Sequence, residues 1–336
     1  MRSYLISKYK QLVMCSQWLQ LFHELCIGKS FRREVLSVYA GFKAHRKLEK
    51  GDGGRVFALR RNIHRIEKGL IMSPRREVFA LDYIDETVAA YVELMRDCER
   101  EYAGELKWFH DVLSEYFNAT TSHAVIDEAR VKFEKAELNS SSSVQASVPM
   151  ARQEYELADI SYEDFYKLCK QRRSVRWYRD DPVPRELVDK AIAAAAQSPS
   201  ACNRQPFEFR IFDQKEMVKK VSAIPGGTVG FSHQFPMMVV LVGKLSAYEF
   251  VRDRHLIYID ASLAAMSFMF ALETLGLSSC SINWPGIESI EREMDTALGL
   301  EPYERPIMLI SVGFASEGGL IPFSEKRGLD ELRRYN

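Results

Sequence analysis

The sequence predicts a chain of two parts, an all-α N-terminal domain followed by a domain that mixes helices and strands. Residues 1–138 carry apolar side chains at spacings of three and four, as in Val88, Tyr91 and Met95, and this is the period of an amphipathic helix. Residues 139–147 form the polar run NSSSSVQAS, which cannot bury enough apolar area to fold by itself. Beyond it, strand-length apolar runs alternate with helical segments, which is typical of an α/β or α+β domain.

We therefore divide the chain into a helical domain at 1–138, a flexible linker at 139–158 and a second domain at 159–336. Within the helical part, the glycine-rich residues 51–54 are the clearest break. The Ser73–Pro74 dipeptide is another break, and Pro74 lies where a new helix can begin.

The second domain shows clear element boundaries. Ser161 and Asp164 have the spacing of a capping box, with Asp164 in the place usually held by Glu or Gln. Tyr258 to Leu275 is a helix with apolar residues on most faces that ends at Gly276, so we expect it to be buried all round, in a core or at a dimer interface. A further alanine-rich helix and four strands are expected at 187–196 and at 207–212, 237–242, 279–284 and 307–314.

Composition excludes several classes of protein. The 336 residues include 46 Lys and Arg and 46 Asp and Glu, and 46% are hydrophobic, which excludes general disorder and a charge-driven nucleic-acid partner. No CxxC pair or Cys/His ligand spacing occurs, so no metal site is expected. The six scattered cysteines suit a reducing cytoplasm; they are Cys15, Cys26, Cys98, Cys169, Cys202 and Cys280.

The early apolar stretch from Leu12 to Gly28 contains polar residues such as Gln17, His23 and Glu24. It is interrupted too often for a bilayer core, so we expect no integral membrane span. Its apolar residues recur at helical spacing and predict an amphipathic helix. Such a helix either packs on the protein's own core or docks on a membrane or partner.

Three clusters in the second domain suit ligand binding. Arg172, Arg173 and Arg176 surround Ser174, and arginine forks with a hydroxyl bind phosphate, although such clusters are also common on solvated faces. Residues 198–207 present amide side chains from a proline-bounded loop, or simply connect a helix to a strand. Residues 276–286 include several small residues, which would let the backbone approach a ligand closely. The alternative is an ordinary helix end that leads into a strand.

Taken in order, these clusters resemble the nitroreductase family of flavin mononucleotide (FMN) enzymes. The resemblance covers about residues 161–336. Its elements are an Arg-x-Ser-x-Arg segment at 172–176, a Pro-Ser-x-x-Asn-x-Gln-Pro-aromatic loop at 199–207, an Asp-led helix ending in Gly-Leu-x-Ser-Cys at 260–280, and a strand followed by a basic pair at 326–327. It implies an α+β fold, a mainly antiparallel sheet flanked by helices.

The resemblance also implies roles by position. The phosphate and ribityl chain of FMN would be held by Arg172, Arg173, Ser174 and Arg176, with Lys326 and Arg327 closing from the C-terminal side. The ring would lie against the loop of Pro199, Ser200, Asn203 and Gln205, and against Ser278 and Ser279. Family members bind the flavin at a homodimer interface, so some of these residues would serve the partner.

The chemistry that the resemblance implies is oxidation of NADH or NADPH and reduction of a small electrophilic acceptor, such as a nitro compound or quinone, in two steps. The sequence assigns no catalytic acid or base. His233 lies in a predicted loop, where it either contacts substrate or is an ordinary surface histidine. The helical N-terminal domain resembles the helical extensions of nitroreductase-like proteins that are associated with bacterial surface-polysaccharide synthesis. The alternatives are reductive dehalogenation, flavin fragmentation, or a scaffold that works through its helical domain.

A charged helical segment at 60–70 places Arg60, His64 and Glu67 near one face. Either this face is solvated, or it covers the flavin site.

Overall fold

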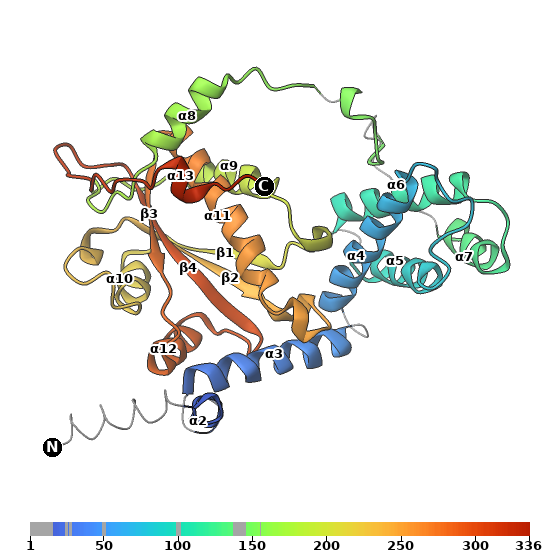
Figure 1. Cartoon of the computed structure of the whole chain (residues 1–336), viewed down its shortest axis with the longest axis horizontal. Coiled ribbons are helices and arrows are strands. Elements are labelled where there is room, and N and C mark those ends of the chain that lie inside the picture. The colour runs from blue at the N-terminus through green and yellow to red at the C-terminus, as the bar shows by residue number, and fades with distance from the viewer. Residues whose placement is uncertain are drawn as a thin grey trace.

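The computed structural model describes residues 16–23, 26, 29–48, 52–98, 102–136, 146–154 and 156–336. The predicted α+β class is confirmed: a helical region precedes a four-stranded antiparallel sheet with helices on both sides (Figure 1). In sheet order, the strands are β1 (Phe207–Phe212), β2 (Met237–Lys244), β4 (Glu304–Gly313) and β3 (Ser278–Asn283).

Both faces of the sheet are buried. On β2, Met237 and Val239 face one layer, while the alternating Met238 and Val240 face the other, and all four are fully buried. This alternation follows from the two-residue period of a strand. The first face packs against α9 (Arg185–Ala195) and α11 (Leu256–Thr274), and the second against α10 (Lys215–Ala223) and α12 (Glu288–Leu298).

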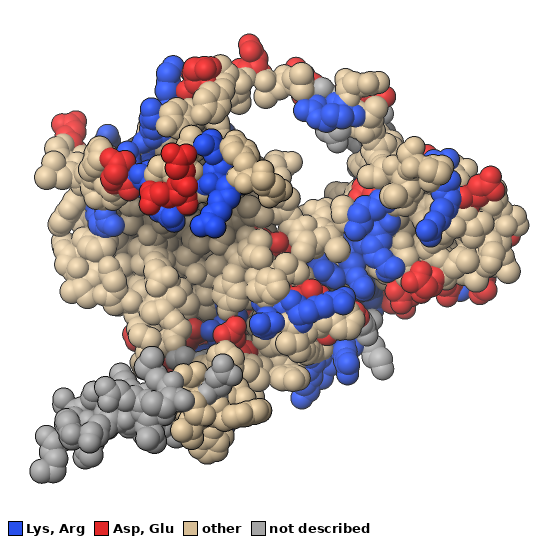
Figure 2. Space-filling view, viewed as in Figure 1, with Lys and Arg blue, Asp and Glu red and all other residues tan. Residues whose placement is uncertain are grey.

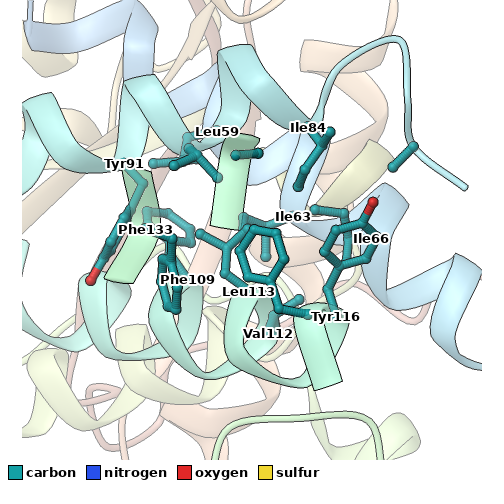
Figure 3. Close-up of a cluster of buried hydrophobic side chains, with 14 of the residues drawn as sticks. Leu59, Ile63, Ile66, Ile84, Tyr91, Phe109, Val112, Leu113, Tyr116 and Phe133 are labelled. Carbon is teal, nitrogen blue, oxygen red and sulfur yellow. The ribbon is translucent and has the colours of Figure 1, made fainter. Parts of the chain in front are cut away.

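The helical region contains a bundle with its own core. Its helices are α4 (Asp52–Leu70), α5 (Ile84–Cys98), α6 (Ala103–Ala119) and α7 (Ala124–Glu134). Each contributes fully buried side chains to one cluster, including Ile63, Tyr91, Phe109 and Ile126, and Figure 3 shows how several of them interlock. At Gly69 the ring of Phe79 approaches so closely that a Cβ would lie 2.2 Å from it.

Helix α3 (Lys29–Leu48) packs on the sheet domain instead of on this bundle core. Val38 is buried against Leu245 and Ile257, and a Cβ on Gly41 would lie 2.7 Å from the Leu245 Cβ. Arg33 at the start of the helix pairs with Glu288 at 3.2 Å, across 255 positions of sequence. Part of the helical region therefore completes the surface of the second half.

The end of α3 nearest α12 covers a buried ionic group. Glu291 is 1% exposed and accepts a hydrogen bond from Arg305 Nη2 at 2.7 Å. Arg33 Nε lies 3.6 Å from the same carboxylate, and the indole of Trp284 donates to it at 3.2 Å. Burial nevertheless raises the pKa of Glu291, against the opposing effect of Arg305.

Most predicted elements of the second domain are confirmed, with ends within a few residues. Ser161 caps α8 (Tyr162–Gln171) by accepting from the Asp164 backbone at 3.0 Å. Helix α11 ends before Gly276, whose φ is +77°. The inner side of α11 lies in the core, as expected. Ile259 and Leu263 are 47% and 43% exposed in the single chain, and burial of this side at a dimer interface stays a prediction.

Two expectations about the helical region also need correction. Pro74 does not begin a helix: residues 71–83 are irregular, and α5 starts at Ile84, where Asp85 and Glu86 place acidic side chains in the first turn. The glycine-rich stretch does not lie wholly in a break, since α4 begins at Asp52. Residues 146–154 and 156–161 lie along the arch between the bundle and α8 (Figure 1), with a short 3₁₀ turn, η2 (Arg152–Glu154).

Helix α11, with the residues just before it, is long and apolar enough to cross a membrane by length and composition. Its inner face packs on the sheet, and it holds the buried carboxyls of Asp260 and Glu273. It is therefore a core helix, and the described residues give no clear membrane span.

Candidate functional site

The arginine-rich segment after α8 runs along the free edge of β3. Ser174 forms a parallel bridge with Ser279, and the Val175 amide donates to the Ser279 carbonyl at 3.0 Å. Tyr178 continues this contact by donating to the Val175 carbonyl at 2.7 Å, and it is buried against Ser311. The strand edge therefore fixes the backbone from which Arg172, Arg173 and Arg176 extend.

Several polar groups of this edge have unused hydrogen-bonding capacity. Arg172 Nε and Ser279 Oγ are buried, and neither has a hydrogen-bond partner. Arg176 makes only a long contact, 3.4 Å from Nη1 to the Ser174 carbonyl. Because buried donors are normally satisfied, this cluster of guanidinium and hydroxyl groups fits an anion such as a phosphate.

The carboxyl of Glu273 lies beside this cluster. Burial raises its pKa, while the Gln171 amide, 3.3 Å away, and the charge of Arg172 oppose the rise. Its Oε1 atom is also buried without a partner. The end of α11 therefore contributes a buried carboxyl close enough to Arg172 to feel its charge.

The loop between α9 and β1 holds a strained conformation. Cys202, Asn203 and Gln205 have φ values of +53°, +51° and +50°, which non-glycine residues adopt at a cost of order 1–3 kcal/mol each. The Gln205 amide donates to Ser200 Oγ at 3.0 Å, and its side chain donates to Asn203 Oδ1 at 3.2 Å. The two predicted ring-contacting amides thus lie side by side, around the 3₁₀ turn η3 (Ala201–Asn203).

A buried carboxyl anchors this loop. Asp260 accepts from the Ala201 amide at 3.1 Å and from the Tyr248 hydroxyl at 3.0 Å. Burial raises the pKa of both Asp260 and Tyr248. The guanidinium of Arg204 lies 4.9 Å from the centre of the Tyr248 ring, which adds a cation–π contact.

The helical bundle contacts the same loop. Arg60 on α4 donates from Nη1 to the Arg204 carbonyl at 2.9 Å and from Nε to Glu105 at 2.6 Å. A cavity of about 350 Å³ lies beside this contact, with Phe57 and Gln205 among its lining residues. Of the two interpretations of the charged face of α4, this contact supports a surface that covers the predicted flavin loop, although His64 and Glu67 instead pair with each other at 3.3 Å.

Behind the cavity lies a paired ionic group. Glu208 Oε2 is 2.5 Å from Lys244 Nζ, and Glu304 Oε2 accepts from Arg210 Nη2 at 3.0 Å. Burial acts to raise the pKa of Glu208, but hydrogen bonds from Lys244 and Arg210 outweigh it and hold the pKa below its usual value. The charges of Lys244 and Arg210 are therefore already balanced by Glu208 and Glu304.

The two predicted flavin-binding segments lie at opposite ends of α11. The loop is tied to Asp260 in its first turns, while Gln171 and Arg172 lie at Glu273 near its last residue. At 1.5 Å per residue, these positions on the 19-residue helix are about 20 Å apart. Ile259 and Leu263, on either side of Asp260 in the helix, are exposed.

The remaining predicted residues lie on the sheet edge or the C-terminal tail. Ser278 and Ser279 begin β3, and Ser279 is the residue with which Ser174 of the arginine segment pairs. The tail passes near Arg173, which donates to the Phe323 carbonyl at 3.2 Å. Lys326 and Arg327 are exposed further along, and Arg327 pairs with Glu331 at 3.6 Å beside the short helix α13 (Leu329–Leu332). In the described part of the chain, the hydrogen bonds and ion pairs of Lys326 and Arg327 go to Glu325 and Glu331 and not to the segment of Arg172 and Arg176.

No side chain near either segment is placed as an evident acid or base. His233 is exposed and lies edge-on to the Trp177 ring, with centroids 6.2 Å apart. Cys280 is buried, and burial raises the pKa of its thiol, which disfavours the nucleophilic thiolate. Within the described residues, no group of three or more His, Cys, Asp or Glu is arranged to hold a metal ion.

Sequence reasoning missed Asp260 and Tyr248 as supports of the loop. Asp260 was recognisable only as the polar start of an apolar helix. Its role depends on a fold that brings residues 201 and 260 together.

The nitroreductase family profile matches residues 169–225 and 217–314. A protein of Archaeoglobus fulgidus with the name "Putative NADH dehydrogenase/NAD(P)H nitroreductase" is 30% identical over 151 residues, which cover 45% of this chain and 83% of that protein. A protein of the same name from Methanothermobacter thermautotrophicus is 27% identical, with coverages of 47% and 81%.

A second group of relatives aligns over more of the chain. Rat iodotyrosine deiodinase 1 is 20% identical over 262 residues, which cover 70% of this chain and 88% of the rat protein. Among solved structures, an FMN-dependent nitroreductase of Clostridium difficile is similar to 50% of this chain over 98% of its own length, with 24% identity and a TM-score of 0.44.

Proposed function

The chain belongs to the nitroreductase family of oxidoreductases, and on that premise we propose that it binds FMN and uses NADH or NADPH to reduce a small electrophilic acceptor. The observation that carries the proposal is the set of unused donors along the edge of β3. Arg172 Nε and Ser279 Oγ are buried without partners beside the lightly engaged Arg176. A phosphate ester would satisfy them with charge-assisted hydrogen bonds.

In this proposal Arg172, Arg173, Ser174 and Arg176 hold the phosphate end of FMN. Ser278 and Ser279 border its ring from the strand, and the amides of Asn203 and Gln205 meet its polar edge from the 199–206 loop. Lys326 and Arg327 would reach the phosphate only if the exposed tail took a different course, so their role stays a prediction.

The separation of the two segments supports a site shared between two subunits. The arginine segment and the loop are about 20 Å apart along α11 of one chain. A two-fold axis near Met266, midway between Asp260 and Glu273, would lay two copies of α11 side by side in opposite directions, on the side that carries the exposed Leu263. Each arginine segment would then lie beside the partner's loop, and we propose a homodimer of this kind.

The chemistry that FMN supplies is hydride acceptance from a nicotinamide and delivery of the electrons to an acceptor. The chain would bind and orient FMN. The arginines would neutralise its phosphate, and the loop anchored by Asp260 would hold the amides of Asn203 and Gln205 in place. Because no acid or base is evident at the site among the described residues, we propose that solvent supplies the protons that the reduced acceptor takes up.

The spectrum of the purified protein tests this function. We expect flavin absorbance, or its appearance on addition of FMN, and bleaching on anaerobic titration with NADH or NADPH. A protein that stays colourless with added FMN, and oxidises neither nicotinamide, would refute the proposal.

Reductive dehalogenation is the second candidate, because the iodotyrosine deiodinase alignment covers 70% of the chain against 47% for the M. thermautotrophicus relative. The longer alignment includes part of the helical region, which the family match omits. Anaerobic turnover of a halogenated tyrosine against a nitroarene and a quinone separates the two. Halide release faster than reduction of either other acceptor would favour dehalogenation.

We also keep, as proposals, a cytoplasmic location, a place in bacterial surface-polysaccharide synthesis, and a scaffold role for the helical region. The scaffold role predicts that surface changes on the bundle abolish cellular function with flavin turnover intact. A truncation test must retain α3, because its removal would uncover the buried Glu291 and Arg305.

A further inference from the structure

One face of α3 is exposed and mixes apolar and basic side chains. Leu36 and Tyr39 are 59% and 60% exposed. Arg32, Lys43 and Arg46 lie at helical spacing from them and are exposed as well. The buried Val38 and Gly41 lie on the opposite side, against the sheet domain, so this face points away from the sheet domain.

Two neighbouring segments extend the apolar part of this face. On α2 (Gln17–Phe22), Trp18 is 80% exposed and Phe22 is 60% exposed, so among the described residues this segment does not pack on the protein's own core. Beside α3, Phe31, Tyr39 and Val251 line an open, mainly apolar cavity of about 420 Å³. We call these exposed residues of α2, α3 and the 250–254 loop the α3 face.

Positive charge surrounds the apolar residues. The cations of the face are Arg32, Lys43, Arg46, Lys47, Arg252 and Arg254. Among the described residues, Arg252 is the only one of these cations that forms an ion pair, a 3.8 Å contact with its neighbour Asp253. Figure 2 shows Lys and Arg side chains gathered around the carboxyl-terminal half of α3, next to the largely uncharged surface of α2.

We propose that the α3 face binds the surface of an anionic lipid membrane, with its apolar side chains inserted among the headgroups. Exposed aromatic and aliphatic residues flanked by Lys and Arg are the composition of interfacial helices, and each cation near an anionic surface contributes about 1 kcal/mol. A second copy of the chain is a poor occupant, because two such faces would bring like charges together. The inference does not depend on the flavin site.

The test is co-sedimentation of the full-length protein with vesicles of phosphatidylcholine, with and without phosphatidylglycerol. We expect binding that requires phosphatidylglycerol and is weakened by salt. Charge reversal by Lys43→Glu with Arg46→Glu should lower vesicle affinity at least tenfold, since two cations are lost. The pair Leu36→Ser and Tyr39→Ser should lower it too.

The matched control is Lys219→Glu with Lys220→Glu, which makes the same charge change on exposed positions of α10. It should bind vesicles nearly as the unaltered chain does. Equal losses in both charge variants would mean that net charge alone drives adsorption, and would overturn the proposal. Absence of binding to anionic vesicles would also overturn it, as would an α3-face variant that changes the oligomeric state without changing vesicle binding.

Discussion

Replacing Arg60 with alanine should weaken FMN binding even though Arg60 belongs to the helical bundle. Its guanidinium holds the Arg204 carbonyl at 2.9 Å, directly between the two ring-contacting amides, Asn203 and Gln205. The loop around this carbonyl carries three non-glycine residues at positive φ. Such a conformation persists only where its surroundings hold it, and Arg60 is one of the groups that do so.

The size of the effect follows from the contact. The Arg60 side chain is only 16% exposed, and a hydrogen bond from a charged donor contributes about 1.5–3 kcal/mol. At the lower end, about 1.5 kcal/mol of loop stabilisation corresponds to a roughly tenfold change in the population of the binding-competent loop, and so in the apparent Kd. Glu105 loses its partner as well, but it can turn to solvent.

The assay is quenching of FMN fluorescence on titration with apoprotein, for Arg60→Ala and for Arg61→Ala. Arg61 is the matched control, because it pairs with Glu249 at 3.5 Å and forms no hydrogen bond with the described residues of the loop. We expect about a tenfold higher Kd for Arg60→Ala only. Equal Kd values for both variants and the unaltered chain would refute the role of Arg60. An equal loss of FMN affinity in both variants would mean that contact between the helical bundle and the second domain, and not the Arg60 hydrogen bond, supports FMN binding.

Three further outcomes are expected. Arg176→Ala should weaken FMN retention by about 1.5–3 kcal/mol, while Arg179→Ala should not, and equal flavin content after gel filtration would contradict the phosphate assignment. Gly69→Ala should cost about 1–3 kcal/mol of unfolding free energy through overpacking, whereas Gly104→Ala, with open space around its Cβ, should not destabilise; urea titrations compare the two. Because the pKa of Glu208 is lowered in the folded state, its contribution to stability is present above its usual pKa of 4.5 and is lost as pH falls through the folded value. Glu208→Gln should therefore flatten the acid limb of a stability–pH profile, and an unchanged slope would count against this ion group.

The sequence predicted the second domain well because its signals are local. The spacing of Ser161 and Asp164 is enough to predict a cap, and the Gly276 end of α11 needs only its neighbours. The family motifs likewise identified the arginine segment and the 199–207 loop before any contact was known. Family membership and the α+β class are confirmed, while the roles of individual site residues stay predictions.

What the sequence could not show depends on contacts between distant positions. The link from Arg60 to Arg204 spans 144 positions, and that from Ala201 to Asp260 spans 59. Hydrophobic periodicity also cannot tell which body a helix packs on, since α3 and α4 show the same kind of pattern. For a related reason the sequence could not divide α11 into a core side and an exposed side, because an apolar surface that awaits a partner has the same composition as a buried one.

The docking of α3 also constrains the order in which the chain can fold during synthesis. Arg33 and Val38 emerge from the ribosome early, yet their partners Glu288, Glu291 and Ile257 emerge more than two hundred positions later. The core of the bundle of α4 to α7 is built from residues 56–133, which are close in sequence, so it can form as soon as it is made. The apolar side of helix α3 stays uncovered until its partners, which include Arg305 on β4, have been synthesised. Docking of α3 is therefore among the last steps of folding. Until then its apolar side is a surface to which chaperones can bind.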